Sequence, residues 1–214
     1  MDNKNDAFLF SEEVIDFVKI ANEFCELAEN TFSFSRQELL EKLQIILPQL
    51  YGQCVKLPQV ESIFEEGNEK FVTEEEYEMV QKGFESKFGY LNDYLEIVEP
   101  DFSDADGPVV CKLSEDFADI FQDLKDFLTL FRIGNNEMMN DAIWETKLNF
   151  GTYWGQKLVN SLRVIHKILN ADEPVIEDIK DSEAIQGTAE RDTSSWFVTR
   201  RQEDFRDIPS IEDE

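Results

Sequence analysis

The feature that most restricts the possible folds is a proline-free run from Asn136 to Leu169. Drawn as a helix, it carries apolar residues around most of its circumference instead of along a single stripe. At 3.6 residues per turn the run would make about nine helical turns. A helix that is apolar on nearly all sides is normally covered by other helices. We therefore predict a helical bundle around one long central helix.

Four further segments have apolar residues at the three- and four-residue spacing of an amphipathic helix, at about 12–30, 36–52, 74–89 and 114–133. Ser35 with Glu38, and Thr73 with Glu76, have the spacing of a capping box, in which each side chain bonds the other residue's backbone amide. Gly134 ends the last of these segments, so the long helix should fold back against it as an antiparallel neighbour.

In two segments between the predicted helices, the apolar residues follow no clear helical or strand period. Residues 52–72 contain Pro58 and Gly67 and should form a long loop, whereas residues 90–100 fit either a short helix or an extended segment. Pro48 should kink or shorten the helix that contains it. Together the patterns predict a single all-α domain of five or six helices over residues 8–170.

The chain is strongly acidic, with 47 acidic and 20 basic residues and a formal net charge of −27. Such a charge argues against direct binding to nucleic acid or to an anionic membrane, since both need clustered Lys and Arg. Proteins with basic patches, or divalent cations, are the expected partners. No secretory signal or apolar run of membrane-spanning length is present, and three scattered cysteines give no disulfide framework, so we expect a cytoplasmic protein.

The composition changes at residue 171. Residues 171–214 carry 14 acidic and 5 basic residues, few aliphatic side chains and two prolines. Such a segment buries too little apolar surface to offset the entropy of ordering, so we predict a disordered acidic tail. One short stretch within it is aromatic and basic. It could be ordinary disordered chain or a docking peptide for a protein partner, and its candidate contact residues are Trp196, Phe197, Arg200 and Arg201.

The helix expected at 114–133 carries a row of four aspartates at three- and four-residue spacing, Asp116, Asp119, Asp123 and Asp126. The spacing places them on one face, opposite the apolar stripe, where a solvated face is the simplest interpretation. A second interpretation is a Mg²⁺ or Mn²⁺ site, because both ions prefer oxygen ligands. A third is partial neutralisation by basic residues of the long helix, namely Lys147, Lys157 and Arg163.

No other constellation points to catalysis. His166 is the single histidine and falls in the last turn of the long helix, where its charge suits the helix dipole. Trp144, Tyr153 and Trp154 fit a core, and nucleotide-loop, zincin and hydrolase-elbow motifs are missing. The leading hypothesis is a non-enzymatic interaction or accessory protein without a cofactor. The alternative is a Mg²⁺- or Mn²⁺-dependent hydrolase of a nucleotide-like phosphate that uses the aspartate face.

Three blocks of sequence resemble a family of bacterial helical proteins, mostly from Bacteroidetes, known only as a domain of unknown function. They are ANEFCELAE at 21–29, SEDFADIFQDLKDFLTLFRIG at 114–134 and NDAIWETKLNFGTYWGQKLVNSLRVIHKIL at 140–169. The resemblance covers about residues 10–170 and implies an all-helical cytosolic domain. It brings no activity, cofactor or catalytic residue, so the functional expectations above depend on the residues themselves.

Overall fold

The computed structural model describes residues 7–64, 67–96, 108–172 and 175. Its helices are α1 (Glu12–Glu29), α2 (Arg36–Lys56), α3 (Glu74–Phe88), α4 (Leu113–Ile133), α5 (Asn136–Asn149) and α6 (Gly155–Leu169). A short π-helical turn, η4 (Phe150–Trp154), joins α5 to α6. Three short 3₁₀ turns lie at Ala7–Phe10 (η1), Thr31–Ser33 (η2) and Gly89–Leu91 (η3). The strands are β1 (Asp93–Glu96) and β2 (Val109–Lys112). The predicted helical bundle is confirmed.

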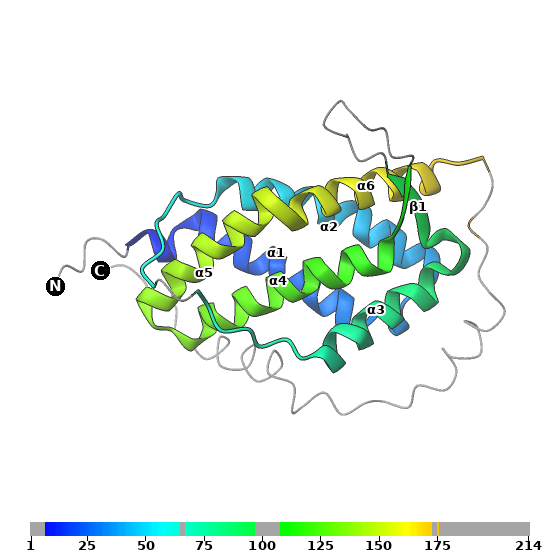
Figure 1. The fold of residues 1–214 in the computed structure, drawn as a ribbon. Coiled ribbons are helices and arrows are strands. Elements are labelled where there is room, and N and C mark those ends of the chain that lie inside the picture. Colours follow the sequence, from blue (N-terminus) through cyan, green and yellow to red (C-terminus); the bar gives the residue numbers. More distant parts are fainter. Residues whose placement is uncertain (1–6, 65–66, 97–107, 173–174, 176–214) are drawn as a thin grey trace, which may run out of the picture.

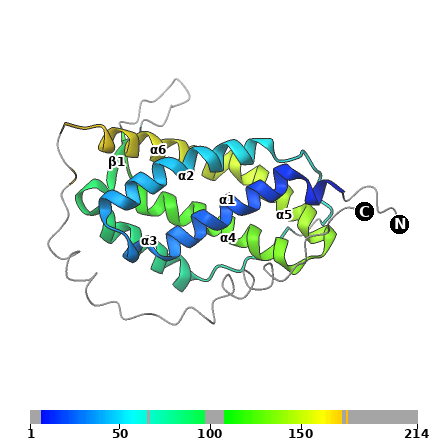
Figure 2. The same ribbon diagram turned by 180° about the vertical axis from the view of Figure 1, so that it is seen from behind.

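The helices form two layers. Figure 1 shows α4 with α5 and α6 on the near face, and Figure 2 shows α1 and α2 side by side on the opposite face. Helix α3 packs against α4 and α1. Helix α4 contacts α1, α3, α5 and α6, whereas the long helix from Asn136 to Leu169 packs mainly on α4 and α2. The described bundle thus has α4 at its centre, and the long helix forms one wall of it.

The long helix is less enclosed than its composition suggests. Trp154 is fully buried, but Tyr153 is 46% exposed, and Leu148 and Val159 are also exposed. The neighbouring helices therefore do not cover every side of the long helix. Apolar residues on several faces therefore reflect one core face plus scattered surface positions, which are common in globular proteins.

The two predicted capping boxes are confirmed. Ser35 and Thr73 each accept a hydrogen bond from the backbone amide three residues on, and the glutamates at those positions return the bond. Gly134 has φ of 78°, in the left-handed region, and lets α4 end and α5 begin within two residues. The local signals were sufficient here because each cap is formed by residues close in sequence.

Helix α2 is longer than its sequence predicts. It continues through Pro48 and Gly52 to Lys56, although the end was expected near Gly52. Leu47, Leu50 and Cys54 on either side of these breakers are fully buried. Tertiary packing of that apolar face offsets the bond lost at the proline and the low helix propensity of glycine.

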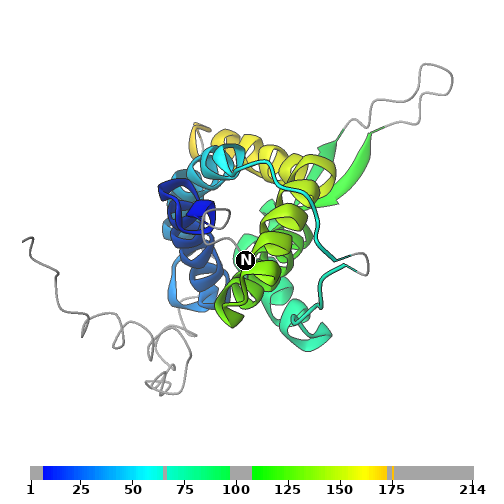
Figure 3. The same ribbon diagram turned by 90° about the vertical axis from the view of Figure 1, so that its left-hand side faces the viewer.

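The connection before α4 is a β-hairpin. β1 pairs antiparallel with β2, with Tyr94 opposite Cys111, so the described part of the open 90–100 segment is a 3₁₀ turn followed by a strand. Figure 3 shows the hairpin projecting from the side of the bundle. Asn92 fixes its base, since its side chain exchanges hydrogen bonds with Ser114 at the start of α4. The hairpin is therefore held against the end of α4.

Some sequence predictions lie outside the described residues. The acidic segment 171–214 is described only at Ala171, Asp172 and Val175, and the aromatic and basic stretch at 194–201 is not described. Among the helices that are described, none combines the length and apolarity needed to cross a membrane.

Candidate functional site

The aspartate row of α4 is not a solvated face, so the simplest interpretation of its spacing is wrong. Asp116 is 4% exposed and Asp126 is 2% exposed. The row is covered by α6 on one side and, toward its C-terminal end, by the connection between α2 and α3. A carboxylate buried in this way requires hydrogen-bond or charge partners, and each of the four aspartates has them.

Asp116 is held by three side chains from two elements, β1 and α6. The Tyr94 hydroxyl of β1 donates to it at 2.6 Å, and the Ser161 hydroxyl of α6 at 3.2 Å. The Lys157 ammonium group lies 3.2 Å away. Burial nevertheless raises the pKa of Asp116, because these partners only partly offset the loss of hydration. Asp116 thus joins α4, α6 and the hairpin.

Asp119 shares Lys157 with Asp116. Its carboxylate lies 2.8 Å from the Lys157 ammonium group and accepts a 2.8 Å bond from the Tyr77 hydroxyl of α3. Partial burial acts to lower the pKa of Lys157, but the bonds to the two aspartates raise it on balance. Of the three basic residues proposed to neutralise the row, Lys157 does so. Lys147 instead bonds the Leu57 carbonyl, and Arg163 lies elsewhere.

The C-terminal half of the row anchors polar groups of other segments. Asp123 accepts a 2.6 Å bond from the Asn149 side chain of α5. Asp126 accepts bonds from the backbone amides of Phe71 and Val72, at 2.7 and 3.0 Å. Burial raises the pKa of both carboxyl groups despite these bonds. This half of the row therefore fixes the loop that enters α3.

The four aspartates are thus spread along a polar seam. In the described part of the chain, no three His, Cys, Asp or Glu side chains are grouped so that they could hold a metal ion. Lys157 occupies the position between Asp116 and Asp119 where a cation would reduce their repulsion. The arrangement is suited to joining helices, and the Mg²⁺ or Mn²⁺ site stays a prediction.

We expect Asp123→Asn to stabilise the protein at neutral pH. The folded-state pKa of Asp123 is raised above its ordinary value of 3.8, so ionised Asp123 lowers the stability, and this penalty disappears as the pH falls through the raised pKa. Asparagine keeps an acceptor for Asn149 without the charge. A gain of about 1 kcal/mol would raise the melting temperature by roughly 2–4 °C at pH 7.5.

The control for this prediction is the same comparison in acid. The advantage of Asp123→Asn should shrink as the pH falls through the raised pKa, and it should vanish well below the ordinary value of 3.8, where the wild-type carboxyl group is protonated in both states. Thermal melts of both proteins over this pH range measure the difference. A variant that melts below the wild type at pH 7.5 would contradict the account.

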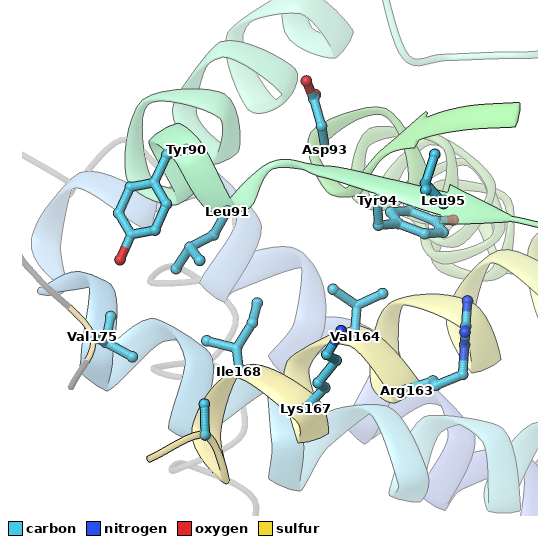
Figure 4. Close-up of a pocket in the computed structure, with 11 residues that line it drawn as sticks. Tyr90, Leu91, Asp93, Tyr94, Leu95, Arg163, Val164, Lys167, Ile168 and Val175 are labelled. Atoms are coloured by element: carbon cyan, nitrogen blue, oxygen red, sulfur yellow. The ribbon is translucent and has the colours of Figure 1, made fainter. Parts of the chain in front are cut away.

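A groove lies beside this seam, between the hairpin and the C-terminal half of α6. It has a volume of about 770 Å³ and a mostly apolar lining. Its walls are formed by Tyr90, Leu91, Asp93, Tyr94, Leu95, Arg163, Val164, Lys167, Ile168, Ala171 and Val175. Figure 4 shows Val164 and Ile168 pointing from α6 toward the opposite wall, from which Leu91 points back. We call this the β1–α6 groove.

The rim of the groove is basic, which is unusual in so acidic a chain. Arg163 and Lys167 are one turn of α6 apart and both are exposed. Neither forms an ion pair with another described residue, whereas Lys157 and Lys125 are paired with carboxylates. The groove therefore offers an apolar floor with two available cations at its edge.

Tyr94 connects the groove to the seam. Its ring lines the groove while its hydroxyl donates to buried Asp116. Two exposed side chains extend the apolar surface next to it, Tyr90 at 62% and Leu95 at 59% exposure. The seam thus holds the hairpin wall in place, and the groove leaves an apolar area large enough for a ligand open.

Sequence reasoning did not find the groove. Its walls come from segments about 70 residues apart, and the 90–100 segment had no assigned conformation. One signal was present, namely that Arg163 and Lys167 follow each other at helical spacing within an acidic chain. Arg163, which one of the three interpretations of the aspartate row pairs with that row, lies instead at the groove.

The other residues that the sequence analysis considered for catalysis or ligand binding lie at a helix end, in the core or at the surface. His166 is exposed in the last turn of α6, as predicted. Cys25 and Cys54 are buried, and burial raises the pKa of both thiols, which disfavours the reactive thiolate. Trp154 belongs to the core, as expected, whereas Tyr153 lies at the surface with Lys157 over its ring.

Comparison with known proteins gives a family but no activity. Residues 8–171 match the family described as a domain of unknown function (DUF5063). The crystal structure of protein BF1032 from Bacteroides fragilis is similar, with a TM-score of 0.69 and 38% sequence identity, and the match covers 79% of this chain and 99% of that chain. A search of curated proteins found no match. The chain therefore belongs to the DUF5063 family.

Proposed function

We propose that the protein is a non-enzymatic interaction module that binds a short peptide segment in the β1–α6 groove. The observation that supports this proposal is an open apolar groove, at whose rim lie two cations that form no ion pair with another described residue. The ligand that fits this chemistry is a segment with two or three aliphatic side chains and one or two carboxylates. Apolar contacts would supply the affinity, and Arg163 and Lys167 would select the acidic side chains.

The positions of the reactive groups favour binding over catalysis. The described carboxylates of α4 are engaged by internal partners, and the buried cysteines have raised pKa values. The groove itself presents cations, one aspartate and apolar side chains, without a nucleophile paired to a base. The earlier expectation of a partner with a basic patch concerns the acidic surface as a whole, whereas the groove is locally basic.

A random peptide-display selection on the immobilised full chain tests the proposal. We expect enriched peptides to combine aliphatic residues with Asp or Glu, and to bind Ile168→Ser at least about tenfold more weakly, since one buried aliphatic anchor contributes more than 1.4 kcal/mol. Ile45→Ser is the matched control, because Ile45 is exposed on α2 outside this groove.

Two outcomes would contradict the proposal. One is an enriched set that binds wild type and Ile168→Ser equally. The other is a melting temperature that rises with Mg²⁺ or Mn²⁺ in the wild type but not in Asp119→Asn, which would favour the alternative of a metal-dependent phosphate hydrolase.

A further inference from the structure

We propose that the β1–α6 groove is occupied in the resting protein by the chain's own segment at residues 175–179, of sequence VIEDI. This inference rests on the proposed function, because it identifies an intramolecular ligand for the same groove. A partner peptide would then bind by displacing this segment, which makes the start of the acidic tail a regulator of the site.

The first argument is that the chain already enters the groove. Val175 lines the groove and packs against the edge of the core. Figure 4 shows it at the end of the groove near Tyr90 and Ile168, with Arg163 at the opposite end. The described chain therefore reaches the groove at Val175.

The second argument is length. Helix geometry places Val164 and Ile168 about 6 Å apart along α6. Four residues in an extended conformation span about 13 Å. The stretch from Val175 to residue 179 is thus long enough to run back along α6, past Lys167 as far as Arg163.

The third argument is chemical complementarity. The segment after Val175 offers two aliphatic side chains, Ile176 and Ile179, and two carboxylates between them, Glu177 and Asp178. The groove offers an apolar floor and two cations that have no ion pair among the described residues. The same combination of aliphatic and acidic groups defines the ligand in the proposed function.

Covalent connection makes even weak contacts sufficient. A segment attached directly to the groove has an effective concentration on the order of millimolar. A contact with a millimolar dissociation constant would therefore keep the groove occupied about half of the time. A free peptide must compete with this occupant, so its apparent affinity falls in proportion to the open fraction.

Limited proteolysis with a glutamate-specific protease tests the inference on the full chain. Docking should protect the bond after Glu177, while the bond after Glu190 lies beyond the docked segment and provides an internal reference. Cleavage that requires opening follows the open fraction. We expect the ratio of the two cleavage rates, Glu177 over Glu190, to rise about twofold in Ile168→Ser, because the open fraction rises from about one half toward one. This variant changes the groove and leaves the tail sequence intact.

A variant in the tail tests the same inference without changing the folded domain. Ile179→Ser leaves every described residue unchanged, and it should also raise the cleavage ratio. Ile185→Ser, an equivalent change further along the tail, should leave the ratio at the wild-type value. A ratio that is the same in wild type, Ile168→Ser and Ile179→Ser would overturn the inference, provided that thermal melts show Ile168→Ser to be folded. If Ile168→Ser is not folded, the result for Ile179→Ser decides.

The outcome separates this inference from the proposed function. If selected peptides bind the wild-type groove and the cleavage ratio does not respond, the groove binds partners and the intramolecular occupant is wrong. If the cleavage ratio rises in the variants but no peptide binds Ile179→Ser, the groove binds only the tail segment and the proposed function is wrong. If both hold, Ile179→Ser should bind the selected peptides more tightly than the wild type does.

Discussion

Replacing Asp116 by alanine is expected to lower the free energy of unfolding by about 3 kcal/mol, because it leaves two buried hydroxyl groups without an acceptor. The Tyr94 and Ser161 hydroxyls both donate to Asp116. Lys157 would keep Asp119 as a partner, so most of the loss should come from the hydroxyls and the vacated space. Chemical denaturation at pH 7.5 measures the change.

Two variants provide the controls for this prediction. Asp116→Asn keeps an acceptor for one hydroxyl and should be less destabilised than alanine. Glu115→Ala removes the neighbouring carboxylate, which is half-buried and lies 3.6 Å from the Lys112 ammonium group, so its effect should stay within about 0.5 kcal/mol. An Asp116→Ala variant as stable as Glu115→Ala would mean that the seam does not hold the hairpin to the bundle.

The second large effect is expected at Gly155, where the π-helical turn meets α6. The Gly155 amide bonds the Phe150 carbonyl, five residues back, and a Cβ at Gly155 would lie 2.2 Å from that carbonyl oxygen. The Phe150 ring lies within 3.1 Å of the same position. Gly155→Ala must therefore distort the turn, and we expect a loss of about 3 kcal/mol in chemical denaturation.

Gly151 is the matched control within the same turn. A Cβ there meets no atom within 4 Å, so Gly151→Ala should stabilise the helix by up to about 1 kcal/mol through reduced backbone entropy. Opposite signs for the two substitutions would confirm that the π-turn requires glycine at only one position. Equal effects would contradict the close approach at Gly155.

Local features of this fold are predictable because local residues determine them. The capping boxes at Ser35 and Thr73, and the left-handed Gly134 between α4 and α5, are all as expected. The end of α2 was not predicted. It depends on whether the burial of Leu50 and Cys54 stabilises the helix more than Pro48 and Gly52 destabilise it.

The aspartate row shows why spacing alone was insufficient. Helical periodicity placed the four residues on one face, but burial depends on what packs against that face. Lys157, Ser161 and Asn149 are polar positions on the long helix, and they supply the partners. The signal in the sequence was that these positions of the long helix are polar although they face another helix. Of the three residues, only Lys157 is among the predicted partners of the aspartates.

The groove was unpredictable for a different reason. β1 becomes a strand by pairing with β2, which follows it further along the chain, and it forms a groove only because α6 passes beside it. Such a site depends on two nonlocal contacts at once. The sequence nevertheless contained its chemical elements, the aliphatic and basic positions of α6 and the VIEDI segment.

The claim that the β1–α6 groove is the binding site is tested most directly by a methyl and amide NMR titration of the full chain with a selected aliphatic, acidic peptide. The account predicts shifts that saturate and concentrate at Leu95, Val164 and Ile168. The same peptide should leave the second surface groove, lined by Leu27, Phe34 and Ile46 among others, unchanged. Shifts confined to that second groove, or no saturable shifts at all, would contradict the account.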